Sequence, residues 1–187
     1  MLSAKEAKQK LAEGNLRYIS AAEPEGDISR EIRRRTAEEG QTPYAIIITC
    51  SDSRVIPECI FSAGIGELFV IRVAGNVLDN HQFGSIEYAA EHLGVKLILM
   101  LGHTRCGAVA AAIEGHSGGY IGYILKDIAA AVGDEKNDYN ACRLNVEHGV
   151  KRIRRELRLH PLANGDGPEV AGAIYNVDTG EVEFLSC

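Results

Sequence analysis

The sequence predicts an α/β fold in which a central, mostly parallel β-sheet is flanked by helices. Three short apolar runs rich in Ile, Val and Leu occupy residues 44–49, 68–73 and 96–101. Continuous runs of this length are typical of strands that are buried on both faces, as in parallel sheets. Helix-like stretches separate the runs, and this alternation favours crossover connections between parallel strands.

Two helices are expected ahead of the first strand. Ser3 and Glu6 have the spacing of a capping box, which predicts the start of a helix over residues 3–20. A second helix is expected over residues 29–39, because a glycine follows and commonly ends a helix. Together these helices would form an N-terminal helical arm, residues 1–40.

The remaining elements alternate toward the C-terminus. Helices are expected at residues 83–93, 108–113, 120–132 and 138–159, the last of them ending before Pro161. The runs 170–175 and 181–185 lie on either side of Asp178-Thr179-Gly180 and predict a C-terminal β-hairpin. A chain of 187 residues has the length of one domain, so we expect residues 1–187 to fold as a single unit.

The charge and hydropathy patterns exclude several kinds of partner. A net charge of −6 disfavours a broad nucleic-acid interface. The two basic clusters, residues 30–35 and 151–158, are interrupted by acidic or apolar residues, which favours solvated helix faces over phosphate-binding patches. No apolar stretch approaches the ~20 residues that span a bilayer. We therefore expect neither nucleic-acid nor membrane partners.

The cysteine content indicates a reducing compartment. The five cysteines are an odd number, which argues against a disulfide framework. The first residues do not resemble a secretory signal, so the cytoplasm is the expected location. No Cys-x-x-Cys pair is present, which leaves metal binding, nucleophilic catalysis or core packing as roles for the thiols.

Polar residues with reactive side chains follow two of the predicted strands. Cys50-Ser51-Asp52-Ser53-Arg54 comes directly after the first strand, and Gly102-His103-Thr104-Arg105-Cys106-Gly107 after the third. Ligands of open α/β sheets bind outside the carboxyl ends of the strands. The two segments can therefore meet in one crevice.

Cys50, His103 and Cys106 have the chemistry of a zinc site. Two thiolates and an imidazole are good zinc ligands, and three protein ligands with an open fourth position are typical of a catalytic site. The spacing of three residues between His103 and Cys106 suits local chelation. Each cysteine taken alone is as well explained as a small buried apolar residue.

Asp52 and Arg54 allow more than one interpretation. Asp52 could be a fourth zinc ligand in a closed state of the site. Alternatively, Arg54 could hold the carboxylate away from the metal and leave that position to water. A loop-capping Asp beside an exposed Arg is the third interpretation, since Ser-Asp-Ser is prone to form turns.

Several motifs, in order and spacing, resemble the β-class carbonic anhydrases over about residues 41–113. The motifs are Cys50 to Val55, Glu67 to Arg72, Ala74-Gly75-Asn76, Ser85 to Ala89 and Gly102 to Gly107. The early Leu11-x-x-Gly14-Asn15-x-Arg17-Tyr18 resembles the N-terminal helix of that family, and residues 170–185 resemble its closing strands. The motifs are specific as a set, although each alone is weak.

The resemblance implies an enzyme that contains Zn²⁺ and reversibly hydrates CO₂ to bicarbonate and a proton. In this family, zinc bound by Cys50, His103 and Cys106 would carry the attacking hydroxide. Asp52 and Arg54 would form the catalytic pair that accepts a hydrogen bond from that hydroxide.

The resemblance also implies substrate-binding residues and an oligomer. Gln41 matches a glutamine that hydrogen-bonds a substrate oxygen, and the backbone of Gly107 would border the pocket. Phe69 and Tyr88 match pocket residues that the neighbouring subunit supplies. The implied assembly is a homodimer or a tetramer of dimers. His92 matches a histidine implicated in proton transfer, and an exposed helix histidine is the alternative.

The sequence departs from the family pattern at two positions. Val73 stands where many members have Asn after the strand arginine, which puts one strand-end hydrogen bond in doubt. Ile47 stands where the bicarbonate-inhibited subgroup has Trp, and Gln41 is retained, so we expect the uninhibited type with an open zinc position.

Three other functions remain as alternatives. Relatives on the same scaffold hydrolyse carbonyl sulfide or carbon disulfide, which are analogues of CO₂. A non-catalytic, zinc-stabilised module would need a closed site with four ligands. A metal-free enzyme with a Cys–His nucleophile is the third alternative.

Overall fold

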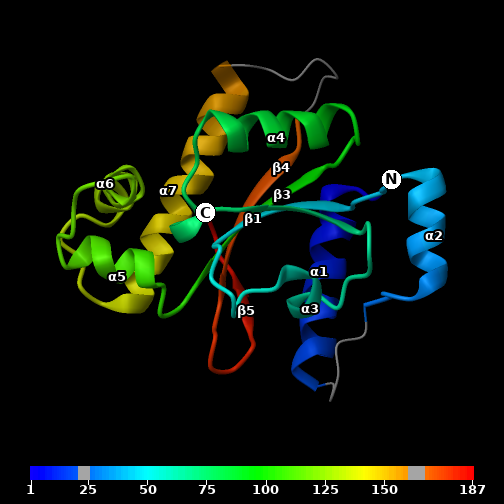
Figure 1. Cartoon of the computed structure of the whole chain (residues 1–187), viewed down its shortest axis with the longest axis horizontal. Helices are drawn as coiled ribbons and strands as arrows, with labels where there is room; N and C mark the ends of the chain where they lie inside the picture. Colours follow the sequence, from blue (N-terminus) through cyan, green and yellow to red (C-terminus); the bar gives the residue numbers. More distant parts are fainter. Residues whose placement is uncertain (21–25, 160–166) are drawn as a thin grey trace.

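The structure, a computed structural model, describes residues 1–20, 26–159 and 167–187, and confirms the predicted α/β class (Figure 1). Five strands form one sheet in the order β2-β1-β3-β4-β5. Their bounds are β1 Ala45–Thr49, β2 Leu68–Arg72, β3 Leu97–His103, β4 Glu169–Tyr175 and β5 Val182–Phe184. The first four strands in that order pair in parallel, and β5 closes the sheet as the antiparallel partner of β4.

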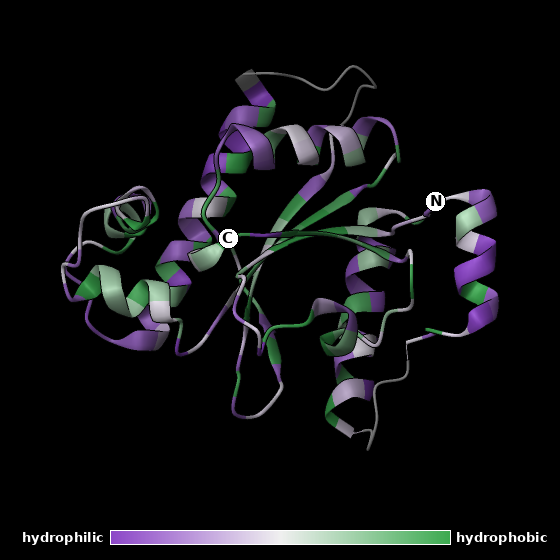
Figure 2. Cartoon of the chain, viewed as in Figure 1, coloured by the Kyte–Doolittle hydropathy of each residue, from purple (hydrophilic) through white to green (hydrophobic). Residues whose placement is uncertain are grey.

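Helices cover both faces of the sheet. One face packs against α1 Ala4–Ser20 and α3 Pro57–Ile60, and the other against α4 Asn80–Glu91, α5 Gly107–Ile113, α6 Ile121–Val132 and α7 Asp138–Leu159. Alternate residues of each strand serve alternate faces. In β1, for example, Ile46 and Ile48 belong to one core cluster and Ile47 to the other. This burial on both sides explains why the central strands β1 and β3 are apolar over most of their length, as the green in Figure 2 shows.

The register of β1 against β3 fixes which residues meet beyond the strands. Thr49 is the Cα partner of Leu101, and its hydroxyl donates a hydrogen bond to the Leu101 carbonyl at 2.8 Å. Both strands run in the same direction, so Cys50 and His103 emerge at the same edge of the sheet. This edge carries the candidate site.

The third strand is longer than predicted. It was expected to end at residue 101, but it continues through Gly102, which pairs with Ile174, to His103. A Cβ at Gly102 would clash with a methyl group of Val146 in α7. The glycine is therefore required by close packing of the sheet against α7, and it does not end the strand.

Most other predicted elements are confirmed within one to three residues. The Ser3–Glu6 capping box forms, and Ser29 and Gly40 cap α2 Arg30–Glu39. The C-terminal hairpin is β4 with β5. The prediction missed α3 and the short 3₁₀ turn Ala74–Asn76, because neither is long enough to show a helical period. Pro161 lies outside the described residues.

The two N-terminal helices differ in how they contact the sheet. Ala7 and Leu11 of α1 are fully buried in the core on one face. In contrast, α2 lies at one end of the molecule and buries Ile32 alone (Figure 1). Helix α1 is therefore an integral part of the core. The division of a single domain of 187 residues into a helical arm, residues 1–40, and a remainder stays a prediction. No described helix is both long and apolar enough to cross a membrane.

Candidate metal centre

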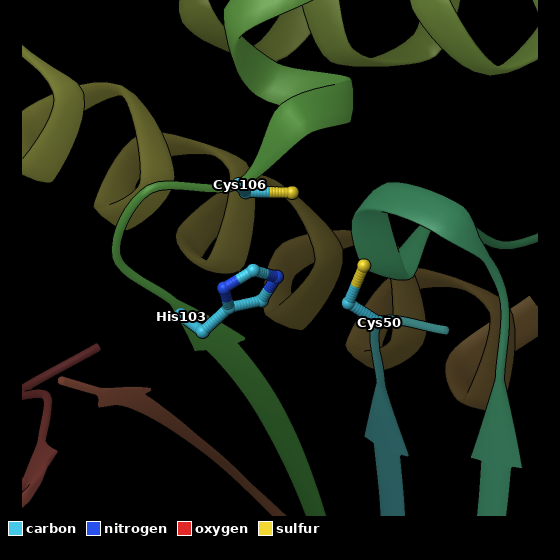
Figure 3. A group of neighbouring side chains, drawn as sticks. All are labelled: Cys50, His103 and Cys106. Atoms are coloured by element: carbon cyan, nitrogen blue, oxygen red, sulfur yellow. The ribbon is translucent and has the colours of Figure 1, made fainter. Parts of the chain in front are cut away.

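Three side chains with metal-binding atoms converge at the carboxyl edge of the sheet. Cys50 follows β1, His103 ends β3, and Cys106 precedes α5. Their candidate ligand atoms all lie within 4.8 Å of one another, and all three residues are buried (Figure 3). Figure 3 shows the two thiols and the imidazole turned toward a common point.

The local chain conformation explains how Cys106 reaches the other two. Arg105 has a φ of +56°, in the left-handed region, so the backbone reverses between His103 and Cys106. Cys106 is then the N-cap residue of α5. Its sulfur faces the backbone N–H groups of the first turn, where the helix dipole favours negative charge.

The two sulfur atoms influence each other's pKa. A hydrogen bond from Cys106 lowers the pKa of Cys50 well below its ordinary value, against the opposing effect of burial. The same contact and burial raise the pKa of Cys106 well above its ordinary value. Backbone N–H groups of Gly75 and Asp52 also donate to the Cys50 sulfur, at 3.2 and 3.4 Å. These contacts favour the thiolate form of Cys50, which is the form that binds metals.

His103 has the orientation of a metal ligand. Its Nδ1 donates to the Thr104 carbonyl at 2.9 Å, since a carbonyl oxygen can only accept. That hydrogen bond leaves the lone pair on Nε2. Within the described part of the chain, the buried Nε2 has no hydrogen-bond partner. A buried polar atom without a partner, aimed at two sulfur atoms, is typical of a metal ligand.

This donor set fits zinc. With bonds of about 2.0–2.3 Å, the ligand atoms of a tetrahedral zinc lie roughly 3.3–3.8 Å apart, within the span that the three atoms cover here. Soft thiolates with an imidazole favour zinc over magnesium or calcium, which prefer oxygen ligands.

Asp52 and Arg54 form a two-pronged ion pair at the mouth of the centre. Arg54 Nε donates to Asp52 Oδ1 at 2.9 Å, and a terminal guanidinium nitrogen donates to Oδ2 at 2.7 Å. The Arg54 side chain holds the pKa of the Asp52 carboxyl well below its usual range. Asp52 Oδ2 is 4.0 Å from His103 Nε2, so the carboxylate lies beside the three candidate ligands while bound to Arg54.

Two further arginines support this arrangement in ways that the sequence did not indicate. Arg72, at the end of β2, donates to the carbonyls of Cys50 and Asp52 at 3.2 and 2.8 Å. The Arg105 carbonyl accepts from the Arg54 guanidinium at 3.0 Å. The loop that carries Cys106 therefore also fixes the ion pair.

Asp138 holds that loop from α7. Its carboxylate accepts from the Arg105 backbone N–H at 2.8 Å, and the Arg105 side chain pairs with Asp178 at 2.9 Å. A non-glycine residue in the left-handed region is uncommon, so the two contacts stabilise a conformation that the chain alone disfavours. In a similar way, Asn145 of α7 donates to the Gly75 carbonyl at 2.9 Å and orients the Gly75 N–H. Only three-dimensional proximity could have revealed these residues.

Of the predicted substrate-binding residues, one lies at this centre. Gly107 is adjacent to Cys106, and it is exposed with open space where a Cβ would be.

The other predicted residues lie away from the metal centre of the same chain. Gln41 and His92 line a separate hollow near the amino end of β1. The five residue-to-residue steps from Ala45 to Cys50 alone span roughly 16 Å at strand rise. Phe69, Tyr88 and His92 form a row of rings, with centroids 6.1 and 5.3 Å apart. One chain therefore does not bring these residues to its own cysteines.

Comparisons with known proteins agree with this geometry. Residues 45–182 match the family model described as carbonic anhydrase. The chain is 42% identical over 181 residues to "Carbonic anhydrase 2" of Mycobacterium tuberculosis. This alignment covers 91% of this chain and 87% of that protein. It is 33% identical over 188 residues to a carbonic anhydrase of Mycolicibacterium smegmatis, covering 94% and 90% respectively.

Solved structures give the class. A β-carbonic anhydrase of Aspergillus fumigatus superposes with a TM-score of 0.69 at 29% identity, covering 84% of this chain and 86% of that one. A second, from Sordaria macrospora and described as tetrameric, gives 0.66 at 27% identity, with 84% and 92% covered. The chain belongs to the β-carbonic anhydrase family.

Asp138 offers a test of how the loop around Arg105 is positioned. Asp138→Ala removes the acceptor of the Arg105 N–H, and loss of such an outer contact typically lowers metal affinity or activity by about 10–100-fold. Asp138→Asn keeps one side-chain oxygen that can accept the hydrogen bond, so it should retain most of the metal affinity and most of the activity. The measurements are zinc affinity by competition with a chelator and kcat/KM for CO₂. The matched control is Asp134→Ala, which should behave as the parent; equal behaviour of both alanine variants would contradict the assignment.

Proposed function

We propose that this protein catalyses the zinc-dependent, reversible hydration of CO₂ to bicarbonate and a proton. The buried cluster of Cys50, His103 and Cys106, in a chain of the carbonic anhydrase family, is the observation that supports this function. Zinc, when bound by these three residues, would supply the Lewis acidity that lets water act as hydroxide near neutral pH.

The residues beside the cluster suit the remaining steps. The Asp52 carboxylate is ionised and held by Arg54, so it is placed to accept a hydrogen bond from the nucleophile and turn a lone pair toward CO₂. Gly107, without a side chain, leaves room for the small substrate next to Cys106.

The arrangement of Asp52 favours an enzyme over a purely structural zinc module. A closed site would need Asp52 as the fourth ligand, but both carboxylate oxygens accept from Arg54. The choice among CO₂, carbonyl sulfide and carbon disulfide depends on the pocket outside this cluster, so each substrate is part of the test below.

The active unit in this proposal contains at least two chains. Gln41, Phe69, Tyr88 and His92 are proposed to act at the metal centre of a second copy, because their own centre is out of reach. The exposed Tyr88 side chain and the edge position of β2 leave that side of the molecule open to such a partner. The similar protein of Sordaria macrospora is described as tetrameric.

The metal assignment is tested with cysteine variants. The parent should hold about one zinc per chain and hydrate CO₂. Cys106→Ser should lose most of the zinc and the activity, because serine is a much poorer zinc ligand. Cys59→Ser, in a thiol outside the cluster, is the control and should keep both. A fully metallated, active Cys106→Ser protein would contradict the metal assignment. If the parent turns over carbonyl sulfide or carbon disulfide faster than CO₂, CO₂ is not the preferred substrate.

The ion pair is tested separately from the metal. Arg54→Ala and Asp52→Ala should each keep zinc, since three ligands remain, but lose activity by on the order of a hundredfold, as expected for a lost positioned acid–base group. Zinc content and CO₂ hydration rate are measured together, with Arg34→Ala on α2 as the exposed control. If both variants turn over at the parent rate, Asp52 and Arg54 form only a turn cap.

The shared site is tested by mixing inactive chains. Gln41→Ala damages the pocket, and Cys106→Ser damages the metal centre. If Gln41 acts at the metal centre of the partner chain, each mixed dimer formed by refolding the two variants together has one intact site. Random two-fold assembly makes about half of the dimers mixed, so the mixture should show roughly a quarter of the parent activity. Light scattering should show a dimer or a larger assembly. A fully active monomer, or a mixture no more active than its components, would refute the shared site.

A further inference from the structure

A basic hollow lies on α7, away from the metal centre. It has a volume of about 490 Å³, and its lining consists of Asp127, His148, Lys151, Arg152, Arg155 and Arg158. This volume falls within the range of roughly 300–1,000 Å³ that is typical of small-molecule sites. His148 lies ten residues beyond Asp138, or roughly 15 Å along the helix axis, so the hollow is separate from the candidate metal centre.

The helical period gathers the basic residues on one side of α7. Positions 148, 151, 152, 155 and 158 recur at intervals of three and four residues, so their side chains are neighbours along the helix. Charged residues on solvated helix faces often alternate in sign. Among the residues that the structure describes, Asp127 of α6 is the sole acidic residue in the lining of this hollow.

Ion pairs leave an excess of positive charge in the hollow. Arg152 pairs with Asp127 at 2.9 Å, and Arg155 pairs with Glu156 at 2.7 Å. Among the residues that the structure describes, Lys151 and Arg158 have no ion pair. The hollow therefore keeps about two unneutralised cations on a chain whose net charge is −6.

One of the donors is fixed in place before any ligand arrives. The Arg152 guanidinium is bound by Asp127 on α6 and lies 5.8 Å from the ring centroid of Phe83 on α4. A guanidinium held between two helices loses little freedom on binding, and its planar fork matches phosphate oxygens.

We propose that this hollow binds a compact anion with two or more phosphate groups. A diphosphate can contact the fixed Arg152 and at the same time reach the unpaired Lys151 and Arg158, whereas a single phosphate spans fewer of these charges. The site is independent of CO₂ hydration, so its test does not depend on the proposed reaction.

His148 provides an internal reporter for the bound anion. Burial and the neighbouring Arg152 lower its pKa, with smaller contributions in the same direction from Arg155 and Lys151, and Asp127 opposes them. An anion in the hollow would offset the repulsion from these cations and raise the pKa of His148. His81 and His116 lie outside the lining and should not respond.

The second basic cluster of the chain supplies a matched control. Arg30, Arg33 and Arg34 on α2 are exposed. They line neither the hollow beside Gln41 nor the basic hollow on α7. The triple variants K151E/R155E/R158E and R30E/R33E/R34E change the net charge equally. They differ in whether the hollow is altered.

The experiment is calorimetric titration of the full-length, zinc-loaded protein with inorganic pyrophosphate, ADP and orthophosphate. We expect saturable binding of one pyrophosphate per chain, at least tenfold weaker binding of orthophosphate, and weakening with added salt. K151E/R155E/R158E should weaken pyrophosphate binding at least tenfold, and R30E/R33E/R34E less than twofold.

NMR titration of the histidines should show an upward shift of the His148 pKa only. Equal affinities for ADP and pyrophosphate assign recognition to the phosphates, and tighter binding of ADP assigns it to a nucleotide diphosphate.

Three outcomes would overturn the proposal. They are no saturable binding of pyrophosphate, equal weakening by both triple variants, and equal affinities for orthophosphate and pyrophosphate. Circular dichroism spectra and thermal unfolding of both triple variants check that they fold.

Discussion

The parallel pairing of β1 with β3 is the constraint on which the candidate metal centre depends. Thr49 lies opposite Leu101, so Cys50, the first residue after β1, and His103, the last residue of β3, emerge at one edge of the sheet. A slip of one residue would reverse which face each side chain serves and separate the ligands. Burial of both faces by apolar residues specifies this register strongly, since Ile46, Ile47 and Ile48 alternate between two cores.

Close contact between two sulfur atoms then has to be accommodated by the surrounding backbone. Two adjacent buried thiolates would repel each other, and the contact between the sulfur atoms lowers the pKa of Cys50 while it raises that of Cys106. The donors at Gly75 and Asp52 stabilise the thiolate form of Cys50, and Asn145 and Arg72 hold those donors from other elements. The packing around the cluster thus favours a divalent cation in the same way as the three candidate ligands do.

The charges of the molecule divide its surface into regions with different partners. At the metal centre, Arg54 and Asp52 neutralise each other within a two-pronged pair, and Arg105 and Asp178 do the same beside them. On the carboxyl-terminal half of α7, cations instead outnumber anions and remain exposed around a hollow. The charge pattern of residues 151–158 favours a solvated helix face, whereas the concave shape around them supports the proposed anion site.

The sequence by itself determined the class of fold, the approximate bounds of most helices and strands, and the three candidate ligands at two strand ends. These features follow from short-range patterns: apolar runs, capping residues such as Ser3 and Ser29, and the three-residue spacing from His103 to Cys106. Tertiary structure decided the rest. It extended β3 through Gly102 because α7 approaches too closely for a side chain, and it brought Asp138 to Arg105 across 33 residues. It also placed Gln41 at the opposite end of β1 from Cys50. Such contacts depend on how helices pack over the sheet, and that packing is a sum of many distant contacts that no local pattern of residues contains.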